Sequence, residues 1–188
     1  VVLMENERVR RHGFLASELE REKKDMLSMY EKMAKEADVF LTSLRLIERK
    51  KFGMEYHTLK EINPRLIYGS VTGHGLEGPD KDMPAYDTTV FWARSGISHL
   101  LTVPGMSGPN PRPAFGDNVA GMALAFGIVT ALYARERLGV GQEIDTSLFF
   151  TGLYQLTFDV AAALATGRDE MEYRLGEGFD GTKEERTE

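Results

Sequence analysis

The feature that most constrains the fold is an alternation of strand-like and helix-like segments between residues 38 and 72. Residues 38–42 and 65–72 are largely apolar and β-branched, as is typical of buried strands. Helical patterns over residues 44–51 and 56–62 separate them. Two strands joined by such a crossover favour a parallel sheet with helices on its faces. The sequence therefore predicts an α/β fold with a Rossmann-like parallel sheet.

The other elements are predicted from apolar spacing and from Gly and Pro boundaries. They are helices over 17–37, 86–97, 118–138 and 148–165, a short strand over 142–147, and loops over 73–84 and 103–116. Residues 1–167 are expected to form part of a large domain that is incomplete at its N-terminal side. Residues 168–188 are acidic and are expected to be a tail or the start of a linker to a second domain.

Composition excludes several classes of function. The 188 residues contain no Cys, so cysteine nucleophiles and thiolate metal sites are excluded, and a cytoplasmic location is expected. A net charge of −6 argues against nucleic-acid binding, which needs a basic surface. We expect no membrane-spanning segment, because no apolar run approaches the required length of about 20 residues. No metal site is expected, since His12, His57, His74 and His99 are scattered among different elements.

One carboxylate stands where a Gly- and Pro-rich loop turns into the long predicted helix. Asp117 follows Phe115 and Gly116, and a run rich in Ala, Gly and Leu continues to Arg137. Such a position meets the positive end of the helix dipole and unpaired backbone N–H groups, which suits a nucleophile whose reaction develops an oxyanion. The alternative is structural, because Asp is also a favoured N-cap residue.

A glycine-rich segment over residues 73–78 matches the pattern G-x-G-x-x-G and follows a predicted strand. A dinucleotide fold is not favoured, because a helix should begin at the third glycine and residues 79–84 cannot form one. The glycines still allow a ligand to approach the backbone closely, or simply form a tight loop.

From about residue 37 onward, the order of short motifs resembles the family III CoA-transferases, the group of formyl-CoA and carnitine CoA-transferases. The resemblance extends over residues 16–167, and its motifs lie at residues 37–40, 52–56, 59–68, 73–79, 85–87, 116–117 and 134–148. The resemblance implies that coenzyme A is a substrate rather than a bound cofactor. It also implies a small carboxylic acid as the second substrate and an interlocked homodimer.

The resemblance assigns roles to individual residues. Asp117 matches the family's catalytic aspartate, which forms a mixed anhydride with the acyl group and then a thioester with CoA. The positions that match contacts with CoA are Ser43, Leu44, Lys51 and Tyr86, and Ser43-Leu44 replaces the family's Asn-Phe pair. The glycines expected to shape the substrate loop are Gly73, Gly75 and Gly116.

Two alternatives to the transferase remain open. Racemases of 2-methylacyl-CoA belong to the same superfamily and keep the acid at Asp117, but they carry a His where this chain has Tyr86. Tyr is a poor base near neutral pH, with a reference pKa of about 10, so the transferase is favoured. The other alternative is an inactive CoA-binding fragment, because both ends resemble cuts from a longer chain. The identity of the acids is not predicted.

Overall fold

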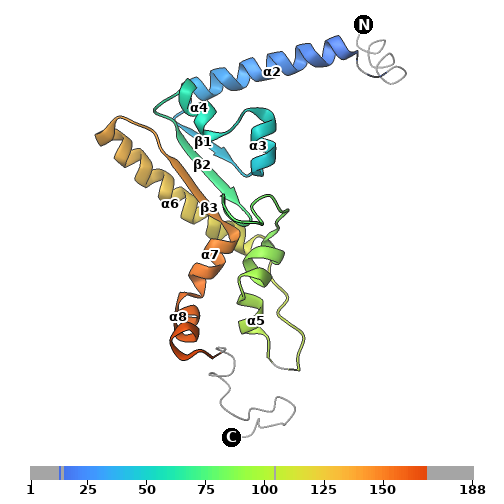
Figure 1. Ribbon diagram of the computed structural model, residues 1–188, viewed down its shortest axis with the longest axis vertical. Coiled ribbons are helices and arrows are strands. Elements are labelled where there is room, and N and C mark those ends of the chain that lie inside the picture. Colours follow the sequence, from blue (N-terminus) through green and yellow to red (C-terminus); the bar gives the residue numbers. More distant parts are fainter. Residues whose placement is uncertain (1–12, 14, 104, 169–188) are drawn as a thin grey trace, which may run out of the picture.

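The computed structural model describes residues 13, 15–103 and 105–168. At its centre is a parallel sheet of three strands in the order β1-β2-β3 (Figure 1). The strands are β1 (Val39–Thr42), β2 (Ile67–Thr72) and β3 (Glu143–Ser147). In register, Val39 lies opposite Ile67, and Tyr68 lies opposite Glu143. The predicted α/β fold with a parallel sheet is therefore confirmed.

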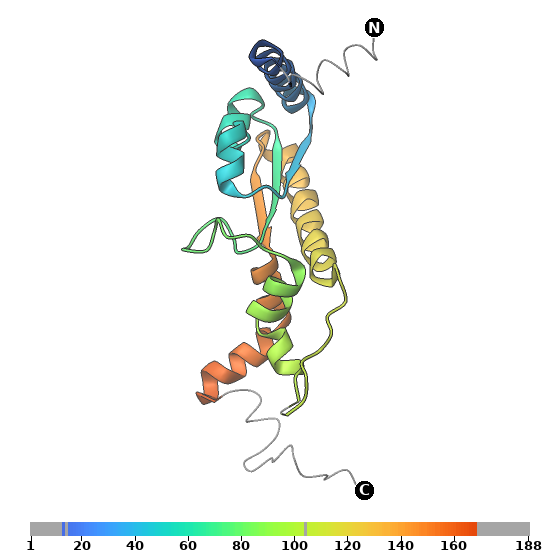
Figure 2. The same ribbon diagram turned by 90° about the vertical axis from the view of Figure 1, so that its right-hand side faces the viewer.

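Helices cover both faces of this sheet. Figure 2 shows α3 (Leu46–Phe52) and α4 (Tyr56–Ile62) on one side of the strands, with α6 (Phe115–Leu138) on the other. On the α4 side, Tyr68 is fully buried, stacks on Phe40 and packs with Leu59 of α4. Ala34 of α2 (Ala16–Glu36) joins the same cluster. The two apolar layers that the βαβ pattern implies are thus both present.

Close packing between α6 and the sheet depends on two glycines. A Cβ on Gly69 of β2 would lie 3.0 Å from the Cδ1 atom of Ile128 of α6. A Cβ on Gly127 of α6 would lie 2.6 Å from the Cγ2 atom of Ile144 of β3. Because each glycine lets a branched side chain of the partner element approach its backbone, α6 lies directly against β2 and β3.

Beyond the carboxyl ends of the strands, a second core forms from η1 (Asp87–Arg94, a π-helical segment), α5 (Ile97–Leu101), α6 and α7 (Leu148–Gln155). The prediction of one helix over 86–97 is wrong, because Gly96 adopts a left-handed φ of 100° and separates η1 from α5. The prediction of one helix over 148–165 is wrong as well. It consists of α7 and α8 (Thr157–Thr166), which meet at a bend of 69°.

Helix α6 is long and apolar enough to cross a membrane by length and composition, which the sequence analysis did not expect. Helices α7 and α8 pass the same test only if they are taken together as one broken span. In α6 the charged residues lie near the two ends, so the interior is uncharged. One side of α6 is buried at Ala120, Leu124 and Ala131, whereas Met122, Phe126 and Val129 on its other side are exposed.

The acidic segment predicted as a tail or linker, residues 168–188, falls almost entirely outside the described residues. The division of the chain at residue 167 therefore stays a prediction. Within the described part, α8 ends where predicted, because Gly167 adopts a left-handed φ of 69° and its N–H donates to the carbonyl of Ala163.

Candidate active site

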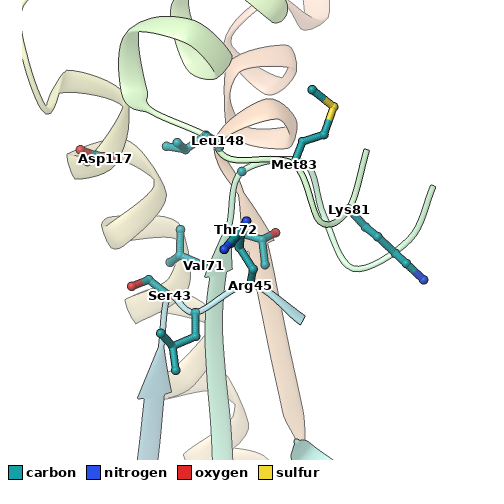
Figure 3. A pocket seen from close by; sticks show the side chains of 11 residues that line it. Ser43, Arg45, Val71, Thr72, Lys81, Met83, Asp117 and Leu148 are labelled. Atoms are coloured by element: carbon teal, nitrogen blue, oxygen red, sulfur yellow. The ribbon is translucent and has the colours of Figure 1, made fainter. Parts of the chain in front are cut away.

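A cavity of about 240 Å3 opens at the carboxyl edge of the parallel sheet. Ser43 follows the end of β1, Gly73 follows β2 and Leu148 follows β3, and all three line this cavity. Asp117 reaches it from the first turn of α6 (Figure 3). In parallel α/β sheets, ligands bind outside the carboxyl ends of the strands, so the cavity lies where this fold places active sites.

Asp117 is not the N-cap of α6, as the structural alternative proposed. Helix α6 begins at Phe115, after Ala114 in a left-handed conformation with φ 61°, so Asp117 is the third helical residue. The N–H of Asn118 already donates to the carbonyl of Ala114. The Asp117 side chain is therefore not needed to cap the start of α6, and it remains exposed to solvent at the cavity.

A second carboxylate lies behind Asp117. Asp87, the first residue of η1, is only 8% exposed, and its Oδ1 accepts a hydrogen bond of 3.1 Å from the backbone N–H of Asp117. Partial burial, and secondarily the negative charge of Asp87, raise the pKa of the Asp117 carboxyl above its ordinary value. The site thus contains two acids whose charges oppose one another.

The backbone donors at the start of α6 are largely engaged within the chain. The N–H of Phe115 donates to the carbonyl of Arg112 at 3.4 Å, and that of Asp117 donates to Asp87. We expected these groups to hold a developing oxyanion. Because two of them already have acceptors, this turn is less available as an oxyanion site than the helix dipole alone suggests.

The structure brings together four of the residues singled out from the sequence. Ser43, Leu44, Gly73 and Asp117 all line the cavity, although Ser43 and Asp117 are 74 residues apart in the sequence. Thr72, the last residue of β2, lies between them in the wall and is labelled in Figure 3. They meet at the carboxyl edge of the sheet, which the sequence analysis did not predict.

The other predicted residues lie elsewhere. Lys51 is exposed in the last turn of α3, with its ammonium 5.7 Å from the centre of the Phe52 ring. Tyr86 is 71% exposed and does not line the cavity. Gly75 lines a separate, larger cavity of about 550 Å3, together with residues that include His74 and Ser147. Their roles in binding CoA or substrate stay predictions.

Gly116 does not line the cavity but supports it from behind. It is buried, and a Cβ there would lie 2.4 Å from Asp87 Oδ1 and 2.2 Å from Phe91 Cγ. The predicted loop glycine is in fact helical, and its lack of a side chain allows Asp87 and Phe91 to approach α6.

Sequence reasoning missed the cations of the cavity. Arg45 and Lys81 both line it, the first just before α3 and the second in the loop after β2, next to Met83 (Figure 3). Arg45 is held by a bond of 2.9 Å from its Nη2 to Glu48. Arg45 could have been found from its position in the sequence, because it lies three residues after a predicted strand. Such cations suit a phosphate or a carboxylate.

Among the described residues, no group of three His, Asp or Glu side chains could hold a metal ion.

Comparison with known proteins identifies the family. Residues 17–180 match the family described as CoA-transferase family III. The chain belongs to this family. Its resemblance to family III members, inferred from ordered motifs, is thereby confirmed.

Individual relatives agree with this assignment. The chain is 43% identical over 131 residues to the cinnamoyl-CoA:phenyllactate CoA-transferase of Clostridium sporogenes, covering 70% of this chain and 32% of that protein. It is 37% identical over 131 residues to the (R)-2-hydroxy-4-methylpentanoate CoA-transferase of Clostridioides difficile, covering 70% and 33%. This family III chain therefore spans about a third of the length of the curated relatives it matches.

A solved structure supports the fold. The crystal structure of a CAIB/BAIF family protein from Brucella suis is similar to this chain with a TM-score of 0.70 and 34% sequence identity. The similarity covers 76% of this chain and 38% of that protein. The sheet and its flanking helices thus belong to a fold shared with this CAIB/BAIF family protein.

Proposed function

We propose that the protein moves CoA from an acyl-CoA thioester to a free carboxylic acid, with Asp117 as the catalytic nucleophile. The observation that carries the proposal is the position of Asp117, exposed in the cavity at the carboxyl edge of the sheet, in a chain of CoA-transferase family III. The relatives named above are CoA-transferases, which supports a transferase rather than the racemase alternative.

In the first half of the proposed reaction, a carboxylate oxygen of Asp117 attacks the thioester carbonyl of the acyl-CoA. The C–S bond breaks, CoA leaves as a thiolate, and an aspartyl acyl anhydride forms. The thiolate then attacks the γ-carbonyl carbon of Asp117. The donor acid leaves as its carboxylate, and an aspartyl-CoA thioester remains on the protein.

In the second half, the carboxylate of the acceptor acid attacks the γ-carbonyl carbon of the aspartyl-CoA thioester. CoA thiolate leaves again, and an anhydride forms between Asp117 and the acceptor. The thiolate attacks the acceptor's carbonyl carbon, which gives the new acyl-CoA and returns Asp117 as a carboxylate. Each half of the reaction, taken as a whole, exchanges one carboxylate for another within a CoA thioester at nearly equal energy, which is why a carboxylate suits the reaction better than an amine or a hydroxyl group.

The acceptor that we propose is a 2-hydroxy acid. Two of the relatives are named for such acids, phenyllactate and (R)-2-hydroxy-4-methylpentanoate. The positive charges of Arg45 and Lys81 at the cavity would attract the carboxylate of such an acid, or the phosphates of CoA.

The test uses the intact protein in D2O with one acyl-CoA and a panel of 2-hydroxy, aromatic and unsubstituted carboxylic acids. Mass spectrometry follows which acids acquire CoA and whether deuterium enters the α-carbon. We expect new CoA esters, most rapidly with 2-hydroxy acids, and a loss of transfer of at least about 10³-fold in Asp117→Ala, because the nucleophile is absent. Deuterium uptake without new esters would instead support a racemase.

We also propose that the protein is a homodimer whose interface covers the outer face of α6 and the exposed sides of α7 and α8. Large apolar side chains exposed by more than 60% are concentrated there: Met122, Phe126, Val129, Tyr133, Phe150, Tyr154, Phe158 and Leu164. Apolar surface of this extent marks a protein contact more often than a solvated face. Light scattering on the intact protein tests the proposal, and a monomeric mass at micromolar concentration would contradict it.

A further inference from the structure

Asp87 is placed unusually for an acid that has only a structural role. It is 8% exposed, and its Oδ1 binds the backbone N–H of Asp117 at 3.1 Å. Its other oxygen, Oδ2, is buried without a hydrogen-bond partner among the described residues. A buried carboxylate lacking a full set of partners is unfavourable for folding. A neutral Asn or Ser would bind the same N–H without that penalty.

The packing around Asp87 fixes it against α6. Gly116 leaves the space that Asp87 Oδ1 and the Phe91 ring occupy, since a Cβ there would lie within 2.4 Å of both. Phe91 is itself buried in the core cluster of η1, α5, α6 and α7. The carboxylate is thus held against the backbone N–H of Asp117 itself, and it does not line the cavity.

We propose that Asp87 is a positioning residue for Asp117: its Oδ1 holds the first turn of α6 in place, and its charge makes the Asp117 carboxylate a stronger nucleophile. The inference rests on the proposed function of Asp117. The raised pKa of the Asp117 carboxyl, caused first by burial and then by Asp87, agrees with it. A carboxylate of higher pKa is a stronger base, and we expect it to attack a thioester carbonyl more readily.

Other titratable groups near η1 are placed differently. Arg94 of η1 pairs with Asp80, and Tyr154 of α7 is 71% exposed. His99 lies on α5 and is exposed. The cations Arg45 and Lys81 line the same cavity as Asp117. The carboxylate of Asp87 is the negative group identified as acting on Asp117 among the described residues.

The experiment compares Asp87→Asn and Asp87→Ala in the intact protein. Both variants remove the charge, and Asn keeps an oxygen for the N–H of Asp117. In both, the acid limb of the pH profile for formation of the aspartyl-CoA thioester should move to lower pH by about half a unit. At neutral pH, the single-turnover rate should fall about 3- to 10-fold in Asp87→Asn, and about 100-fold in Asp87→Ala, where the turn also loses its anchor. Either variant alone tests the charge.

Glu18→Gln is the matched control, because Glu18 Oε2 accepts the backbone N–H of Leu15 at the start of α2 at 2.8 Å, and no residue of α2 lines the cavity. Its pH profile should equal that of the parent. Parent profiles in the Asp87 variants, with transfer abolished in Asp117→Ala, would overturn the positioning role alone. Transfer that survives in Asp117→Ala would overturn the proposed function itself. A thermal unfolding midpoint of Asp87→Asn equal to the parent's, with a shifted profile, supports the proposal over a purely structural role.

Discussion

The two ends of α6 differ in how their charged groups are paired. At its C-terminal end, Arg135 is 8% exposed, and its guanidinium binds Asp38 Oδ1 at 2.8 Å and the carbonyls of Asp38 and Arg65 at 3.3 and 3.1 Å. At its N-terminal end, Asp87 and Asp117 face each other without an intervening cation. Both ends agree with the helix dipole, which favours acids at the start and cations at the end.

The difference lies in whether the charges are neutralised. Arg135 binds the carbonyls of Asp38 and Arg65, which lie just before β1 and β2, so this end of α6 ties the starts of the two strands together. The two acids at the other end repel one another, so this end is less stable than it could be. A folded protein keeps such an arrangement where it supports a function, because sites of reaction are where local stability is sacrificed.

The largest effect should come from Gly116→Ala at the N-terminal end. The new Cβ would overlap Phe91 and Asp87, displacing both, so we expect kcat to fall about 100-fold. The unfolding free energy should fall by about 1–3 kcal/mol from overpacking. Transfer kinetics and chemical denaturation measure the two effects. Gly121→Ala on the same helix is the control, because nothing lies within 4 Å of its added Cβ. Equal kinetics in the two variants would remove the special role of this end.

An intermediate effect, on stability alone, should come from Arg135→Met at the C-terminal end. The variant loses the bonds to Asp38 and to the carbonyl of Arg65, so unfolding should become easier by about 2 kcal/mol, with kcat unchanged. Denaturation and transfer kinetics at the same temperature test this. Arg137→Met, at an exposed guanidinium 4.5 Å above the Tyr133 ring, should change stability by less than about 0.5 kcal/mol. A fall in kcat matching that of Gly116→Ala would contradict the comparison.

The smallest effect should be a pH-dependent gain in stability in Asp117→Asn. Because the folded protein raises the pKa of Asp117, it disfavours the ionised form. The stability linked to its protonation is present below the ordinary pKa of 3.8 and lost as pH rises through the higher folded value. Asn removes this penalty, so the variant should be more stable near neutral pH by a few tenths of a kcal/mol, since Asp117 is exposed. Unfolding curves at pH 7 and pH 3.5 test this, and an equal gain at both would contradict the sign.

The sequence predicted most of the sheet because its strands are short, apolar and bounded by clear breaks. Helix α4 was predicted with its observed bounds, Tyr56–Ile62, because Asn63-Pro64 ends it unambiguously. Asp117 was singled out by its place at the start of the long predicted helix and by the family resemblance. The strands, the bounds of α4 and the choice of Asp117 depend on local sequence patterns, which can be recognised in a single sequence.

Other features depended on packing between distant segments. Gly116 was interpreted as part of a loop, whereas its small size serves the contact of η1 with α6. The left-handed Ala114 that starts α6 has no signal in its residue type, since Ala rarely adopts φ above zero. The sequence analysis gave Asp87 no role of its own, and its bond to the N–H of Asp117 joins residues thirty positions apart. Hydrophobic periodicity in a sequence does not predict a contact between residues so far apart.

Residues 74–84 leave the sheet and return to nearly the same point. A Cβ on Gly73 would lie only 2.0 Å from the Cβ of Ala85, so the two ends of this excursion touch. Lys81 and Met83 are carried on it, whereas Ser43, Thr72 and Leu148 belong to the ends of strands and to α7. The loop over residues 74–84 can therefore change in length or sequence while the part of the cavity formed by Ser43, Thr72 and Leu148 keeps its shape. A loop whose two ends touch transmits little strain to the elements that it joins.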